Sequence, residues 1–150
     1  MHEQSSGAPR SQQEKRTACA ASYWNSTLDP LNRGASDAGR ACAPDMQRAF
    51  DTFLTPETAR AIDLLGDLEG RDVLVLGCGL GLGALHLAQR GARVLATDSS
   101  EQRCTAAQAW CQERNLRGSL RFRVMPAEAL DVSAQAYDCV FARDVLMYVS

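Results

Sequence analysis

Hydrophobic residues along this chain gather into short runs that predict buried strands, separated by stretches with helical spacing. The run Val73–Leu76 has four apolar residues in succession and is bounded by turn residues, which is typical of a strand buried on both faces. Three further strands are predicted at Arg93–Asp98, Leu120–Met125 and Tyr137–Ala142. Leu120–Met125 alternates apolar and basic residues, so we expect this strand to expose one polar face.

Helix signals occupy the segments before and between these strands. Apolar residues on one side of Met46–Leu54 predict a short helix. Thr55–Glu57 supplies an N-cap, a proline at the first position and an acid in the first turn of a second helix, which is predicted to end at Gly70. Another helix is predicted over Ser99–Arg117, with Ser99 as its N-cap. The alternation of strands and helices predicts an α/β fold with a parallel sheet and right-handed crossovers.

The chain divides into three parts by composition. Residues 1–22 are rich in Ser, Gln, Arg and Ala and hold almost no large apolar side chains. Such a segment cannot bury enough apolar surface to offset the entropy lost on ordering, so it is predicted to be a disordered tail. Residues 23–54 contain turn-forming residues followed by the short helix, and residues 55–150 carry the alternating strands and helices.

Charge and cysteine spacing narrow the classes of function. The chain has 150 residues and a net charge of −2 at pH 7, which argues against a nucleic-acid binder with a basic face. No apolar run is long enough to span a membrane and no signal peptide is visible, so a cytoplasmic protein is expected. None of the six cysteines forms a CxxC pair, so no metal site is expected and the thiols are expected to be reduced.

Glycines at alternate positions follow the first predicted strand, at Gly77, Gly79, Gly81 and Gly83. Glycine permits sharp turns and lets a ligand approach the bare main chain. The free N–H groups at the start of the following helix favour an anionic group. Asp98 ends the next predicted strand, roughly 20 residues beyond the first glycine, where a carboxylate is placed to accept hydrogen bonds from ribose hydroxyls.

With these glycines, Cys78 and Asp98, residues 55–150 resemble a class I S-adenosylmethionine-dependent methyltransferase. Tyr137–Val149 is similar to the family's fourth-strand segment. The resemblance implies a Rossmann-like parallel sheet with flanking helices, of which strands 1–4 of the usual seven are present, and a lid formed by residues 23–54. It also implies the N-terminal portion of a larger enzyme, in which the missing C-terminal half or a partner chain covers the open sheet edge.

The resemblance implies the cofactor S-adenosyl-L-methionine and a small-molecule methyl acceptor. The cofactor-binding residues that it implies are Gly77, Cys78, Gly79, Gly81, Asp98, Ser99, Ala127, Glu128 and Arg143. Arg143 and Asp144 are candidates for contact with the acceptor, and no residue is assigned as the catalyst. Tyr148 stands where many relatives have a histidine base, but positioning of the reactants can supply much of the rate acceleration.

Two residues depart from the family pattern. Val75 stands where the family commonly has an acid that helps to hold the cofactor's amino group. The loss of one such charged hydrogen bond weakens binding by about 1.5–3 kcal/mol if nothing replaces it. Pro126 stands where the family often has an aspartate that contacts the adenine amine. Ala127 still offers its backbone N–H, and Glu128 matches the family's acid at its own position.

Two other functions remain open from the sequence. A nicotinamide-dependent oxidoreductase, which would bind NAD(P), also uses a strand, a glycine loop, a helix and an acid. Its fingerprint needs a small residue where this chain has Leu82. A non-catalytic binding module that kept the fold is favoured by Val75 and Pro126. Titration with the two types of cofactor distinguishes the three functions.

Overall fold

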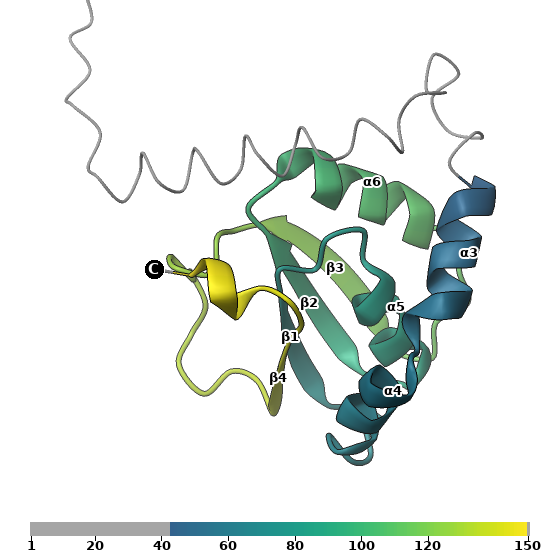
Figure 1. The fold of residues 1–150 in the computed structure, drawn as a ribbon. Helices are drawn as coiled ribbons and strands as arrows, with labels where there is room; N and C mark the ends of the chain where they lie inside the picture. The colour runs from purple at the N-terminus through teal and green to yellow at the C-terminus, as the bar shows by residue number, and fades with distance from the viewer. Residues whose placement is uncertain (1–42, 150) are drawn as a thin grey trace, which may run out of the picture.

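Helices and strands alternate along residues 43–149, the part of the chain that the computed structural model describes (Figure 1). The elements are α3 (Ala43–Phe53), α4 (Pro56–Asp63), β1 (Asp72–Leu76), α5 (Leu82–Gln89), β2 (Arg93–Asp98), α6 (Glu101–Cys111), β3 (Ser119–Val124), β4 (Cys139–Ala142) and the 3₁₀ helix η1 (Leu146–Tyr148). The predicted tail, residues 1–22, and most of residues 23–54 lie outside the described residues.

The four strands form one parallel sheet, as the sequence predicts, and their order is β3-β2-β1-β4. Val75 of β1 lies between Ala96 of β2 and Phe141 of β4 in the register of the sheet. The chain leaves β1 toward β2 and β3 on one side and returns to the other side with β4. The loops that follow the strands therefore meet at the carboxyl edge, where open α/β sheets bind ligands.

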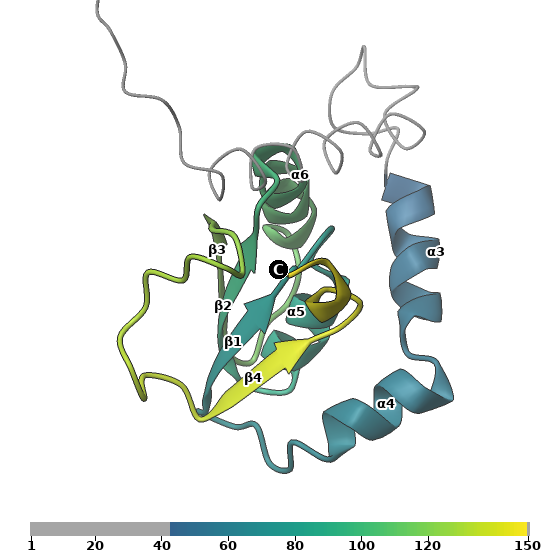
Figure 2. The ribbon, with the colours of Figure 1, turned by 60° about the vertical axis from the view of Figure 1, so that its left-hand side comes forward.

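Helices α3, α4, α5 and α6 lie on one side of the sheet, while the connection between β3 and β4 runs along the opposite side (Figures 1 and 2). Helix α5 presents Ala84, Leu87 and Ala88, all fully buried, to Val73 and Val75 of the central strand. This apolar layer forms the core that fixes the start of α5 beside the end of β1. No helix within residues 43–149 is long and apolar enough to cross a membrane.

The second helix is shorter than its apolar stripe predicts. Thr55 caps α4, and its Oγ1 accepts the Thr58 N–H at 3.3 Å, as expected. The helix ends at Asp63 rather than at Gly70, because Gly66 adopts a positive φ of 76° that breaks the helical path.

The N-cap of α6 is Ser100 and not Ser99. The Ser100 Oγ accepts the Arg103 N–H at 3.2 Å, and the backbone N–H of Ser100 donates to Oδ1 of Asp98 at 2.9 Å. Ser99 is therefore released from the helix cap and faces the loop region at the carboxyl edge. The helix also ends at Cys111, before the predicted Arg117.

The start of β4 is fastened to the start of β1. Asp138 accepts the Asp72 N–H through Oδ2 at 2.8 Å, and its own N–H donates to the Asp72 carbonyl oxygen at 2.8 Å. This pairing sets the register in which Leu76 lies beside Ala142 at the carboxyl end. On β4, Val140 is 56% exposed, which leaves an apolar side chain uncovered in the outermost strand.

Candidate functional site

The glycine loop after β1 turns back beneath the chain that leaves β4. Gly77 and Gly79 have positive φ angles of 58° and 53°, a conformation that strongly favours glycine. The Cys78 N–H donates to the Thr97 carbonyl oxygen at 2.8 Å, which continues the contact between β1 and β2. A Cβ atom on Gly77 would collide with the side chain of Val145. The absence of a side chain at Gly77 therefore allows the segment after β4 to cross the loop.

Asp98 joins the glycine loop to the end of β2. Its Oδ2 accepts the Gly79 N–H at 2.8 Å, while its Oδ1 accepts the Ser100 N–H at 2.9 Å. The side chain is buried except for the part that faces the carboxyl edge. A carboxylate can accept about four hydrogen bonds, so each oxygen keeps capacity for a further donor such as a hydroxyl.

Gly81 packs closely against the neighbouring helix and strand. It is the N-cap of α5 with a φ of 79°, and it lines neither of the two hollows described below. A Cβ atom there would lie 3.0 Å from the Phe122 ring and 3.1 Å from the Ala107 side chain. Its small size lets the loop lie against α6 and β3.

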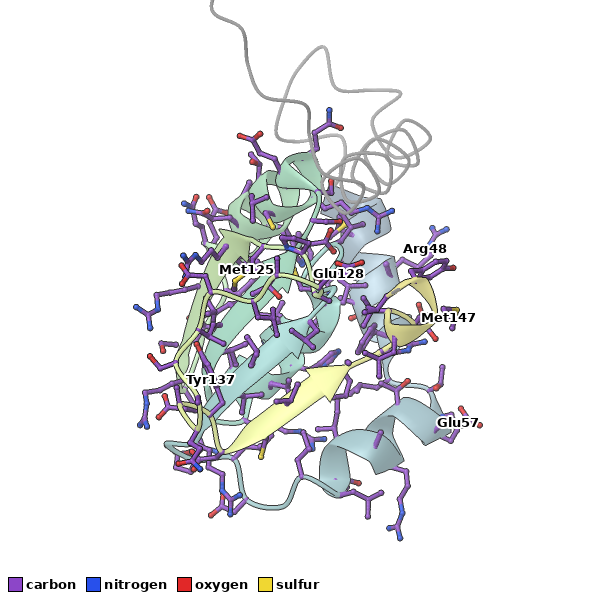
Figure 3. All side chains as sticks on the ribbon, turned by 90° about the vertical axis from the view of Figure 1, so that its left-hand side faces the viewer. Arg48, Glu57, Met125, Glu128, Tyr137 and Met147 are labelled. Carbon is purple, nitrogen blue, oxygen red and sulfur yellow. The ribbon has the colours of Figure 1, made fainter. Side chains whose placement is uncertain are left out.

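The first hollow opens at the carboxyl edge between the loops after β1, β2 and β3 and the segment that follows β4. Figure 3 shows Met125 and Glu128 at this end of the sheet, the end toward which the strand arrows point. The hollow is lined by Gly77, Asp98, Ser99, Arg103, Met125, Ala127, Glu128, Asp144, Val145, Tyr148 and Val149. Of the residues that the resemblance assigns to the cofactor, Gly77, Asp98, Ser99, Ala127 and Glu128 are brought together here.

The second hollow lies on the other side of Gly77, between the ends of β1 and β4 and the start of α5. It is lined by Phe53, Val75, Leu76, Gly77, Cys78, Gly83, Phe141, Arg143 and Asp144. A Cβ atom on Gly83 would lie 3.0 Å from the Phe53 ring and 3.2 Å from the Phe141 ring, so both rings stand close to the start of α5. Gly77 and Asp144 belong to both hollows, which are therefore adjacent.

Two opposite charges stand beside each other in the second hollow. Arg143 Nε lies 3.3 Å from Oδ2 of Asp144, and the Arg143 guanidinium stacks over the Phe53 ring with its central carbon 4.6 Å from the ring centroid. Asp144 has a φ of 55°, a left-handed conformation that aspartate adopts more readily than most residues. The backbone at Asp144 therefore turns sharply where the chain passes from one hollow to the other.

The Cys78 thiol is unsuited to nucleophilic chemistry. Its hydrogen bond with Cys104 raises the pKa of Cys78 well above the ordinary value, and burial raises this pKa further. The neutral thiol, which is a weak nucleophile, is thus the form present near pH 7. Cys78 contributes its backbone and its volume to the second hollow.

His86 lies apart from both hollows. Its ring stacks on Phe50 with the centroids 4.0 Å apart, and Nε2 is 3.3 Å from the Phe50 carbonyl oxygen. Burial lowers the pKa of His86 below the ordinary value. Within residues 43–149 His86 is the sole histidine, so no histidine base faces the site from the described part of the chain. The same residues hold no group of three or more His, Cys, Asp or Glu side chains suited to a metal ion.

The first hollow includes residues that sequence reasoning did not assign to the site. Arg103 reaches it from the first turn of α6, three residues after the N-cap Ser100. Met125 follows β3 directly, where the carboxyl edge begins. Val145, Tyr148 and Val149 reach the hollow only because the chain folds back after β4, and no local pattern marks that return.

Comparison with known proteins agrees with this geometry. A family model described as a methyltransferase domain matches residues 73–150. A ubiquinone biosynthesis O-methyltransferase from Psychrobacter cryohalolentis is 28% identical over 148 residues, which cover 93% of this chain and 53% of that protein. The enzyme of the same name from Methylocella silvestris is 39% identical over 82 residues, which cover 55% of this chain and 31% of that protein.

A solved structure shows the same fold with a ligand. Magnesium protoporphyrin IX methyltransferase from Synechocystis PCC 6803 with bound SAH aligns with a TM-score of 0.64 and 27% identity. The alignment covers 89% of this chain and 60% of that chain. By comparison, this chain spans about half the length of the ubiquinone biosynthesis O-methyltransferase from Psychrobacter cryohalolentis.

Proposed function

The chain belongs to the methyltransferase-domain family, and we propose that it binds S-adenosyl-L-methionine and takes part in methyl transfer to a small-molecule acceptor. The observation that carries this proposal is the hydrogen bond between Gly79 and Asp98, which joins the glycine loop to an acid at the rim of the first hollow. The relatives are methyltransferases by name, which favours this function over that of a nicotinamide-dependent oxidoreductase.

The residues of the first hollow suit the adenosine half of this cofactor. Asp98 has free lone pairs for ribose hydroxyls, and Ala127 and Glu128 border the space beside it. Met125 and Val145 supply apolar surface of the kind that a purine ring requires. Gly77, Cys78, Gly79 and Gly81 shape the loop, and only Gly77 and Cys78 of these border a hollow.

When bound, the cofactor would supply a methyl group on a sulfonium centre for in-line transfer to a nucleophilic acceptor, with the sulfur leaving as a neutral thioether. The part of the chain that the structure describes contributes positioning of the reactants rather than a histidine base. Arg143 borders the second hollow and Asp144 borders both hollows, and these two residues are the acceptor-side candidates. A small-molecule acceptor is supported by the names of the relatives, which refer to ubiquinone biosynthesis and to magnesium protoporphyrin IX.

Residues 55–150 are proposed as the cofactor-binding domain and residues 23–54 as a lid. The described end of the lid supports this assignment, because Phe53 of α3 forms one wall of the second hollow. Among the described strands β4 pairs only with β1, and its free edge supports a further strand there, from another part of the protein or from a partner chain. The neighbouring free thiols of Cys78 and Cys104 support a reducing compartment such as the cytoplasm.

Calorimetric titration of the chain with S-adenosylhomocysteine, and separately with NADH, tests the proposal. We expect micromolar binding of S-adenosylhomocysteine that is abolished in Asp98→Ala and retained in Asp63→Ala. Asp63 is a matched control, because it is an exposed acid paired with Arg90 at 3.0 Å outside both hollows. Binding of NADH alone would contradict the proposed cofactor, and binding of neither would favour a module without cofactor function.

A further inference from the structure

Two cysteine thiols lie in contact beside the glycine loop, and the proposed methyl transfer makes no use of either. Cys78 belongs to the loop after β1, and Cys104 belongs to the start of α6. Both thiols are free, and they share a hydrogen bond. Although the two residues are far apart in the sequence, their side chains are therefore close enough to react with one another.

The end of β2 holds both cysteines at the same point of the sheet. The Cys78 N–H donates to the Thr97 carbonyl oxygen at 2.8 Å. The Sγ atom of Cys104 lies 3.9 Å from the Asp98 carbonyl oxygen and 3.7 Å from the Arg123 carbonyl oxygen of β3. Since Thr97 and Asp98 are consecutive residues of β2, the backbone itself brings the two side chains together.

The glycine loop lies along the face of α6 that carries Cys104. A Cβ atom on Gly79 would lie 3.5 Å from Nη1 of Arg103. A Cβ atom on Gly81 would lie 3.1 Å from Cβ of Ala107. Arg103 directly precedes Cys104, and Ala107 follows it by about one helical turn. The loop and the helix thus touch on both sides of the thiol pair, as a cross-link between them requires.

The two thiols differ in acidity and in access. The hydrogen bond from Cys78 lowers the pKa of Cys104 below the ordinary value, although burial opposes this effect. The same hydrogen bond raises the pKa of Cys78. Cys104 is therefore the thiol of the pair that ionises first. Cys78 borders the second hollow, which gives a small oxidant a way to the pair.

We propose that Cys78 and Cys104 are a redox modification site, at which hydrogen peroxide forms a reversible disulfide. The Cys104 thiolate attacks a peroxide oxygen, which gives a sulfenic acid and releases hydroxide that takes up a proton from water. The Cys78 sulfur then attacks the sulfenic sulfur, and the oxygen leaves as water with the Cys78 proton. The two thiols lose two electrons in all, and the peroxide is reduced to two waters. The new bond ties the glycine loop to α6 beside Asp98.

Peptide mapping of the full chain after exposure to hydrogen peroxide tests the inference. Catalase removes the peroxide, iodoacetamide in urea alkylates the remaining thiols, and the chain is digested without reductant. We expect a cross-linked peptide that joins Cys78 to Cys104, lacks two hydrogens and is separated by dithiothreitol. Cys111 and Cys139 should be recovered as alkylated thiols. Burial raises the pKa of Cys111 to about 12, so this thiol stays neutral.

Three variants show whether the pair reacts as a unit. Cys104→Ser should abolish the cross-link and leave Cys78 as a thiol, whereas in Cys78→Ser the reaction should stop at a Cys104 sulfenic acid that dimedone traps. Cys111→Ser is the matched control, since Cys111 is also a buried thiol of α6, and its cross-link should form at an unchanged rate.

The absence of a cross-link, or a cross-link to a different cysteine in its place, would overturn the inference. An equal yield of the Cys78–Cys104 peptide from the chain unfolded in urea would also overturn it, because the folded contact would then not direct the reaction. None of these outcomes depends on whether the chain binds S-adenosylhomocysteine.

Discussion

The backbone N–H of Gly79 donates a 2.8 Å hydrogen bond to the Asp98 carboxylate, so the glycine loop after β1 is joined to the end of β2. The other oxygen of the same carboxylate accepts the Ser100 N–H before α6. One side chain thus holds two loops in place while it borders the first hollow. Asp98 is expected to affect the stability of the loops as well as ligand affinity.

Replacement of Asp98 by alanine should lower the free energy of unfolding by about 1–3 kcal/mol, because Gly79 and Ser100 lose the acceptor of their N–H groups. Asp98→Asn should lower the free energy of unfolding by less, since the asparagine amide oxygen can still accept one of these hydrogen bonds. Urea denaturation of the three proteins measures the difference. If the alanine and asparagine variants lost the same free energy of unfolding, the two hydrogen bonds would not stabilise the fold.

Gly81→Ala should destabilise the chain more than Gly66→Ala. Both glycines have similar positive φ angles, 79° and 76°, so both variants carry the strain of a side chain in this conformation, about 1 kcal/mol. A Cβ atom at Gly81 also presses on Phe122 and Ala107, whereas nothing lies within 4 Å at Gly66.

The denaturation midpoints of the two glycine variants separate backbone strain from packing. If Gly81→Ala lowers the midpoint more than Gly66→Ala does, the difference measures the cost of disturbing the packing of the loop on α6 and β3. If Gly66→Ala were equally destabilised, close packing at Gly81 would not explain the need for glycine there.

Acid should weaken the fold through His86. Burial lowers the pKa of His86 in the folded chain, whereas the unfolded chain keeps the ordinary value near 6.5. The unfolded state therefore binds more protons as the pH falls from about 6.5 toward the folded-state pKa, and the free energy of unfolding decreases over this range. Nearby Arg90 acts in the same direction, while Asp51 and the contact with the Phe50 carbonyl oppose it.

The contribution of His86 is measured by urea denaturation at pH 5 and pH 7.5 in the unaltered chain and in His86→Phe. Phenylalanine can retain the stack on Phe50 and cannot take up a proton. We expect a smaller pH dependence in the variant. If the free energy of unfolding differed between pH 5 and pH 7.5 by as much in His86→Phe as in the unaltered chain, groups other than His86 would cause the acid sensitivity.

The Cys78 thiol should react slowly with iodoacetamide at pH 8. The hydrogen bond with Cys104 and burial both raise the pKa of Cys78, and only the thiolate reacts readily. Mass spectrometry of the Cys78 peptide gives the alkylation rate in the folded chain and in urea. A folded-state rate equal to that in urea would contradict a shielded, neutral thiol.

The central strand and the glycine loop could be predicted from the sequence because their signals are local. The run Val73–Leu76 determines burial, and the glycines that follow it determine a turn that other residues adopt only with strain. Asp98 was identified for the same reason, since it ends the next apolar strand. Parallel pairing with right-handed crossovers follows from the alternation of strands and helices, but the order β3-β2-β1-β4 does not follow from it.

The roles of the individual glycines could not be read from their even spacing. Gly77 lies under Val145, Gly79 donates to Asp98, and Gly81 packs on Phe122, although the pattern presents them as equivalent. The sequence pattern also could not show that Ser100 rather than Ser99 is the N-cap of α6. Two adjacent serines have the same propensity, and the Asp98 carboxylate decides between them by accepting the Ser100 N–H.

The sequence by itself determined the strands, the glycine turn and the acid after β2, because each depends on residues that are neighbours in the chain. Only the tertiary structure decided that Arg103, Tyr148 and Asp144 converge on the first hollow with Gly77. These residues come from separate segments, and they meet because β4 pairs with β1 and α6 packs against the glycine loop. Strand pairing over long separations sets such contacts, and no local pattern encodes which distant residues will face each other.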